Sequence, residues 1–152
     1  MMNIKKRFFS EIHLNDPFFD SLKEDYPCFQ TWFENKSKEI AYIYTEKRNI
    51  LAFMYLKIEE SPCPFITPPL SSSKKMKVGT FKVEKEKIGL GKCLLDIAIN
   101  EAKKQHINEL YVTVHHTKKH HQNLILFLKK HGFIFHGYKN NEVVYRKDVS
   151  NE

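Results

Sequence analysis

A turn with two glycines, Gly89-Leu90-Gly91, constrains the fold of this chain more than any other segment. Before it, residues 76–84 have the composition of a β-strand, and after it residues 90–106 repeat apolar side chains at helical spacing. Residues 109–115 then alternate between apolar and polar side chains, which predicts another strand. Strand, helix and strand in this order form a right-handed βαβ unit, which requires two parallel strands. We therefore predict an α/β fold.

Further elements are predicted on both sides of this unit. Asp16 and Pro17 are typical of a helix start, and Pro27 restarts the chain into a second short helix. The many aromatic side chains of these two helices are predicted to lie in the core. A chain of 152 residues has the size of one ordinary domain, so we expect a single domain over residues 1–152 with one mixed sheet. The other predicted elements are strands over 4–14, 40–44, 50–58, 133–138 and 142–147 and a helix over 119–130.

Residues 61–73 are predicted to be irregular because they contain Pro62, Pro64, Pro68 and Pro69 together with a run of serines. A loop of this length is near the upper limit for a compact domain, and long loops often face a substrate. A lid or substrate-facing loop is one interpretation of the segment, and a mobile connection is the other.

The composition excludes several classes of protein. With 41% hydrophobic residues, the chain has enough apolar side chains for a folded core. No apolar run approaches the length of a membrane-spanning helix, and no secretory signal pattern follows the first residues, so we expect a cytoplasmic protein without a membrane partner. The three cysteines include no Cys-x-x-Cys pair, which argues against a disulfide framework and a zinc site.

The net charge of +7 favours anionic partners such as a phosphorylated cofactor or RNA, although a solvated basic surface would have the same composition. The glycine turn is a candidate binding site for such a cofactor. Amides at the start of a helix have no partner inside the helix, and the helix dipole adds positive potential there. The turn therefore predicts a phosphate or pyrophosphate site, unless the glycines only allow the helix to pack closely on the strand.

The order of elements and the glycine turn resemble the GNAT superfamily of acyl-CoA-dependent N-acyltransferases. The family signature is Arg/Gln-x-x-Gly-x-Gly/Ala, and the segment Glu86-Lys87-Ile88-Gly89-Leu90-Gly91 keeps both glycines but has a glutamate at the first position. A second family landmark, a helix that ends in Gly-Phe, matches Gly132-Phe133. In that helix the family's tyrosine falls on Leu128 and its asparagine on His121. The resemblance covers about residues 10–147.

The resemblance implies a central mixed sheet of about six to seven strands flanked by about four helices. It also implies acetyl-CoA as cosubstrate, with the pyrophosphate on the amides that follow the strand and the pantetheine arm beside the end of that strand. The acetyl group would pass to a primary amine of a protein, a small molecule or an RNA-linked acceptor such as aminoacyl-tRNA. The expected cofactor-binding residues are Phe81, Val83, Lys87, Ile88, Gly89, Leu90, Gly91 and Lys92.

The general acid and base are open, because Leu128 cannot replace the family's tyrosine. Histidine titrates in the range that either role needs, and His115, His116, His120 and His121 lie between the last strand of the βαβ unit and the next helix. We select His120 and Tyr138 as candidate catalytic residues. Other candidates are Tyr111 as an acid and Glu84 or Glu142 as a base.

A metal site is not expected, because the histidine-rich segment has no carboxylates or cysteines at a set ligand spacing. The alternative to an enzyme is a non-catalytic module with a GNAT-like fold that binds CoA or a nucleic acid. Leu128 and Glu86 favour this alternative. The sequence allows a monomer or a homodimer.

Overall fold

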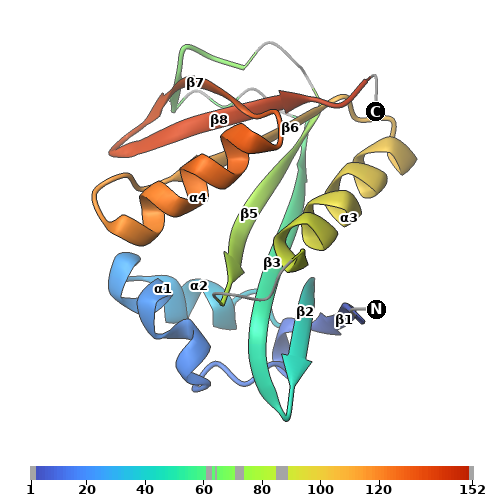
Figure 1. The fold of residues 1–152 in the computed structure, drawn as a ribbon, viewed down its shortest axis with the longest axis vertical. Coiled ribbons are helices and arrows are strands. Elements are labelled where there is room, and N and C mark those ends of the chain that lie inside the picture. The colour runs from blue at the N-terminus through green and yellow to red at the C-terminus, as the bar shows by residue number, and fades with distance from the viewer. Residues whose placement is uncertain (1–2, 61–62, 64, 71–73, 85–88, 151–152) are drawn as a thin grey trace. The chain divides into compact units, whose positions relative to one another are not determined.

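The computed structural model describes residues 3–60, 63, 65–70, 74–84 and 89–150. Within them the strands form one eight-stranded mixed sheet in the order β1-β2-β3-β5-β6-β8-β7-β4 (Figure 1). The α/β class with a mixed sheet is confirmed, and there are eight strands where about six to seven were expected. The strands are β1 Lys5–Phe8, β2 Ile40–Glu46, β3 Asn49–Glu59, β4 Ile66–Thr67, β5 Lys75–Val83, β6 Glu109–Val114, β7 Ile134–Lys139 and β8 Glu142–Asp148.

The described residues also form four α-helices and two short 3-10 helices, which agrees with the expected number of helices. They are η1 Phe9–Glu11, η2 Pro17–Phe19, α1 Asp20–Asp25, α2 Phe29–Glu34, α3 Leu90–Lys104 and α4 Lys119–Lys130. In this part of the chain, no helix combines the length and the apolar character that crossing a bilayer requires.

The chain forms two compact units. Unit 1 comprises Met1–Tyr55 and Thr80–Leu95, and unit 2 comprises Leu56–Gly79 and Asp96–Glu152. Three elements, β3, β5 and α3, contribute residues to both units. A single domain over residues 1–152 stays a prediction.

The core of unit 1 is aromatic, as predicted for the two short helices. Phe19 is fully buried, and its ring lies 5.5 Å from that of Phe53 on β3. The predicted helix start is confirmed, because the Asp16 carboxylate accepts hydrogen bonds from the amides of Phe18 at 2.9 Å and Ile50 at 3.2 Å. The strand predicted over residues 4–14 is wrong beyond Phe8, where the chain turns into η1 and buries Phe9 in the same core.

Unit 2 contains the predicted parallel pair. Strands β5 and β6 are parallel from Met76↔Leu110 to Val78↔Val112. Strand β8 lies antiparallel to β6 on one side and to β7 on the other (Figure 1). The strands predicted over residues 133–138 and 142–147 form a hairpin, with Asn140 of its turn in the left-handed region at φ 53°.

The segment predicted to be an irregular loop contains strand β4. Ile66 pairs with Lys139 and Thr67 with Tyr138 of β7. Gly137 makes this close approach feasible, since a Cβ atom there would lie 2.1 Å from the Thr67 carbonyl oxygen. This part of the segment is therefore a strand at the edge of the sheet, and residues 61, 62, 64 and 71–73 lie outside the described part of the chain.

Candidate functional site

The predicted phosphate site begins where β5 has ended. Gly89 has a φ of 82°, a left-handed conformation that favours glycine, and helix α3 starts at the next residue. The Cys93 amide donates to the Gly89 carbonyl at 3.0 Å, so Gly91 lies in the first helical turn, ahead of that hydrogen bond. Leu90 is buried, whereas Gly89 and Lys92 are exposed and Gly91 is half-buried. The predicted ligands Lys87 and Ile88, together with Glu86, lie outside the described residues.

The end of β5 offers main-chain groups along one edge. In the described structure the pairing of β5 with β6 stops at Val78↔Val112, although β5 continues to Val83. Phe81 and Val83, the predicted neighbours of the pantetheine arm, lie in this continuation and are half-buried. Just past the strand, the Glu84 amide donates to the Leu51 carbonyl of β3 at 2.7 Å. The end of the strand is therefore held from the β3 side.

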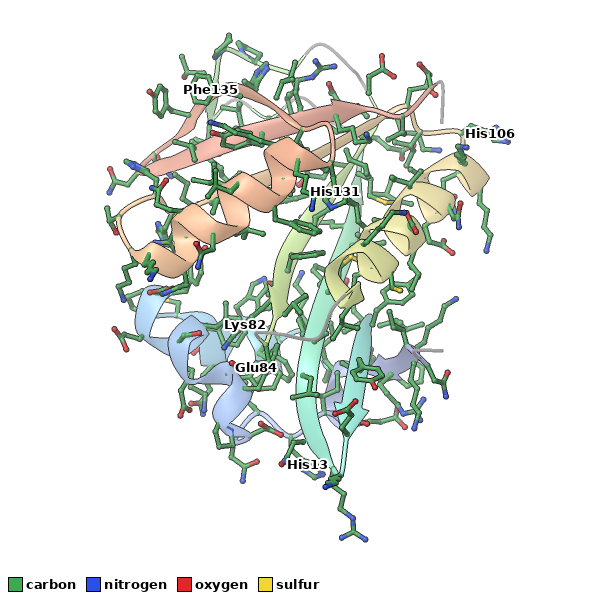
Figure 2. All side chains as sticks on the ribbon, viewed as in Figure 1. His13, Lys82, Glu84, His106, His131 and Phe135 are labelled. Atoms are coloured by element: carbon green, nitrogen blue, oxygen red, sulfur yellow. The ribbon has the colours of Figure 1, made fainter. Side chains whose placement is uncertain are left out.

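Lys82 fixes the same end of β5 to the first helices of unit 1. Its ammonium group donates to the Phe18 carbonyl and, at 2.8 Å, to the Ser21 hydroxyl, and lies 4.5 Å from the centre of the Phe18 ring. Burial lowers the pKa of Lys82, and the negative charge of Glu84 opposes that shift. Figure 2 shows Lys82 and Glu84 together at the end of β5. The glutamate predicted as a base therefore lies beside the half-buried ammonium group of Lys82.

The structure brings three of the four candidate histidines together in unit 2. The ring of His121 lies 4.3 Å from that of His120 and 5.5 Å from that of His115. His121 is buried, and its Nδ1 accepts a hydrogen bond from the Lys118 amide at 3.0 Å. His120 is exposed, and so is His116, whose carbonyl accepts from the Gln122 side chain. His120 is therefore the member of the ring cluster that solvent reaches most freely.

The two candidate tyrosines have opposite environments. Tyr138 on β7 is 54% exposed, and its ring lies 5.4 Å from that of Phe135. Tyr111 on β6 is buried, and its hydroxyl donates to the carboxylate of Glu59. Burial and this hydrogen bond raise the pKa of Tyr111 far above its ordinary value. Tyr111 is therefore a poor proton donor, and Tyr138 is the more available phenol.

The sequence analysis missed Glu59 and Cys63, which form a polar cluster with Tyr111. The Cys63 thiol donates to Glu59 Oε1 at 3.2 Å and lies 3.6 Å from the Tyr111 hydroxyl oxygen. Although burial opposes it, these hydrogen bonds and the charges of Lys77 and Lys57 lower the pKa of Glu59. A cysteine inside a proline-rich segment and a glutamate at the end of an apolar strand were the only signals in the sequence.

The fold was compared with those of known proteins. No protein-family profile and no curated protein sequence matches the chain. Solved structures do match along nearly its whole length. PaiA N-acetyltransferase from Thermoplasma acidophilum in complex with coenzyme A superimposes with a TM-score of 0.64 at 18% identity, over 97% of this chain and 99% of that one. A GNAT family acetyltransferase from Elizabethkingia anophelis with acetyl-CoA bound gives a TM-score of 0.58 at 15% identity, over 96% and 98% of the two chains.

Naa20 from Chaetomium thermophilum in complex with a bisubstrate analogue gives a TM-score of 0.67 at 18% identity, over 96% of this chain and 86% of that one. The chain has the GNAT fold. In this fold, β5 corresponds to the strand before the glycine turn and α4 to the helix that ends in Gly-Phe. Leu128, at the family's tyrosine position, is buried at 2% exposure in the core. Gly132 follows α4 with a φ of 91°, as a glycine at a helix end does.

Proposed function

We propose that this protein is an N-acetyltransferase that moves the acetyl group of acetyl-CoA to a primary amine. The observation that carries the proposal is the left-handed turn at Gly89, placed between the start of α3 and the end of β5, whose described pairing with β6 stops at Val78↔Val112. Amides in the first turn of a helix suit a pyrophosphate, and an unpaired strand edge suits the amide groups of a pantetheine arm. Proteins of the same fold carry coenzyme A and acetyl-CoA.

In this proposal the pyrophosphate lies on the amides around residues 87–92, where Gly89 and Gly91 are the described residues without a side chain. The missing arginine or glutamine of the family signature weakens this site without removing it, because the main-chain donors need no particular side chain. The pantetheine arm runs beside Phe81 and Val83. His120 and Tyr138 stay our candidates for proton transfer, since both are exposed.

The chemistry requires a neutral amine. A lysine amine with an ordinary pKa near 10.4 costs about 4.6 kcal/mol to deprotonate at pH 7, whereas an α-amine costs about 1 kcal/mol. An α-amine therefore needs less help from a general base. The net charge of +7 also suits an acceptor that is linked to RNA or to another polyanion.

Thermal melting with acetyl-CoA tests the binding site. A ligand at about 100 times its Kd adds about 2.7 kcal/mol to the unfolding free energy, so the transition should move upward. Gly91→Glu should abolish this shift, because it adds bulk and negative charge where the pyrophosphate lies. Asn100→Glu, which adds the same single negative charge at an exposed position of the same helix, should keep it. An equal shift in wild type and Gly91→Glu would contradict the proposed site.

A CoA-binding module without turnover is the second candidate, and the burial of Leu128 favours it. The family's tyrosine protonates the departing thiolate, and an aliphatic side chain cannot. Release of free thiol from acetyl-CoA over a panel of amines distinguishes the two functions. A melting shift without thiol release above background would support the module.

A further inference from the structure

Unit 1 contains a surface cavity that the proposed acyl transfer does not use. Its volume is about 270 Å³, and its walls come from η1 and the residues after it, from the end of α2 and from the turn that follows α2. None of the lining residues is among those proposed to bind acetyl-CoA or to transfer protons. The cavity is therefore a candidate for a separate binding site.

One part of the cavity wall is apolar. Phe9, Ile12 and Phe33 line it and belong to the buried aromatic core, and Leu14 packs beside them. The ring centres of Phe9 and Phe33 lie 4.8 Å apart. Close packing holds such side chains in place, so this wall keeps its shape when nothing is bound. The volume is just below the lower limit of about 300 Å³ for drug-sized ligands, so the apolar wall suits a small aliphatic or aromatic group.

The rest of the lining is polar and exposed. It consists of Ser10, Glu34 and Ser37. The Ser10 amide donates to the Ser37 carbonyl at 3.2 Å, and the Phe9 amide donates to the Glu39 carbonyl at 2.9 Å. These main-chain hydrogen bonds join η1 to the turn after α2, so both sides of the cavity are held in place before a ligand arrives. A ligand with one polar end would keep that end at the exposed rim and bury its body against the apolar wall.

Glu34 determines which polar end the rim prefers. Of the residues that line the cavity in the described structure, it is the only charged one. The nearest lysine in the sequence, Lys36, forms an ion pair with Glu39 at 3.4 Å. A carboxylate attracts a cation and repels an anion, and an ammonium group forms strong hydrogen bonds with it. The rim therefore favours a ligand with a positive charge.

We propose that this cavity binds a small organic ammonium ion, with the apolar body of the ligand against Phe9 and Phe33 and its ammonium group at Glu34. The ammonium group donates to the Glu34 carboxylate and has donors left for the hydroxyl groups of Ser10 and Ser37. Its charge is also attracted to the faces of aromatic rings. A carboxylate of the same size is repelled by Glu34, and a neutral alcohol lacks the charge that Glu34 attracts. The inference does not rest on the proposed acyl transfer.

An NMR titration with three probes of similar shape tests the preference for a cation. In ¹⁵N-labelled protein without acetyl-CoA, 2-phenylethylamine at pH 7 should shift the amide signals of Ser10, Glu34 and Ser37 until they saturate. The neutral 2-phenylethanol should bind about 3- to 5-fold more weakly, which is the contribution of an exposed charge pair, and the anionic 3-phenylpropionate more weakly still. Equal affinity for the amine and the alcohol, or shifts spread over the whole surface, would overturn the proposal.

Two variants locate the site. Glu34→Gln keeps the size of the side chain and removes its charge, so the amine should bind about 3- to 5-fold more weakly and lose its advantage over the alcohol. Glu60→Gln, the same change at an exposed glutamate of unit 2, should leave both affinities unchanged. Ser37→Trp fills the cavity from an exposed position and should abolish the shifts of Ser10 and Glu34 with either probe. Wild-type affinity for the amine in Glu34→Gln, or saturable shifts in Ser37→Trp, would overturn the site. Without acetyl-CoA in the sample, these outcomes are independent of the proposed function.

Discussion

At the scale of single residues, charged side chains of the sheet find their partners on neighbouring strands. Glu109 is 1% exposed, and its Oε2 lies 2.5 Å from the Nε of Arg146 on β8. The Glu59 carboxylate on β3 accepts a hydrogen bond from the Tyr111 hydroxyl on β6, again between strands that are distant in sequence. A charged residue in an apolar strand was visible in the sequence, but its partner was not, because the pairing depends on the strand order. The candidate site was therefore predictable at the glycine turn, which is local, and not at these pairs of side chains on different strands.

Removing Arg146 should be strongly destabilising. Arg146→Met leaves the Glu109 carboxylate buried without its counter-charge, which typically costs about 3–5 kcal/mol of unfolding free energy. The double variant Glu109→Leu with Arg146→Met should recover most of that loss, because two apolar groups need no compensation. Urea unfolding measures both. Lys104→Met, which breaks the exposed bridge to Glu101 at 3.3 Å, is the control and should cost less than about 1 kcal/mol. A small effect of Arg146→Met would mean that water reaches Glu109.

Burial, and next the charge of Lys139, lower the pKa of Lys77 on β5 to about 8, which predicts how stability depends on pH. The folded state holds fewer protons than the unfolded state between pH 8 and 10.5, so the unfolding free energy should rise with pH across that window. Below pH 8 the charged Lys77 destabilises the folded state by the full amount, and above pH 10.5 this cost is absent because the lysine is neutral in both states. Urea unfolding measures the unfolding free energies of wild type and Lys77→Met. From pH 7 to pH 10 the value for wild type should therefore rise relative to that for the variant. We expect about 1–2 kcal/mol, reduced by solvent screening. A pH-independent difference would contradict the lowered pKa of Lys77.

At the scale of elements, periodic patterns predicted most of the fold. Helix α4 has the bounds that its apolar spacing indicated, and β5, α3 and β6 follow the expected βαβ order. The errors lie where tertiary contacts decide the backbone. Strand β4 has two residues in a proline-rich segment, and its pairing depends on the space that Gly137 leaves on β7. The early end of β1 depends on burying Phe9 in the aromatic core, which no local pattern shows.

The hairpin between β2 and β3 offers a stabilising change. Lys47 and Arg48 both have positive φ, 50° and 70°, in a two-residue turn that Asn-Gly fits with less strain. Lys47→Asn with Arg48→Gly should raise the unfolding free energy by about 1 kcal/mol, measured by thermal and urea unfolding. Lys47→Ala with Arg48→Ala removes the same charges and keeps the strain, so it should give no gain. Equal stabilisation by both double variants would show that charge, not backbone strain, is the cause.

At the scale of the whole molecule, we expect the two compact units to unfold together. Strands β3 and β5 and helix α3 each contribute residues to both units. Opening either unit would break the main-chain hydrogen bonds of elements that continue into the other. We therefore propose that residues 1–152 behave as one cooperative domain.

Two core substitutions, one in each unit, test this cooperativity. Phe19→Leu loosens the aromatic core of unit 1, and Val144→Ala loosens the sheet of unit 2, where both residues are fully buried. Each should cost about 1–3 kcal/mol. The fluorescence of Trp32 reports on unit 1, and hydrogen exchange of β6 and β8 reports on unit 2. In one cooperative domain both probes lose the same free energy in both variants, because every substitution lowers a single global stability. If Phe19→Leu shifts the Trp32 transition while exchange in β6 and β8 stays at the wild-type rate, the units unfold independently and the single-domain prediction is wrong.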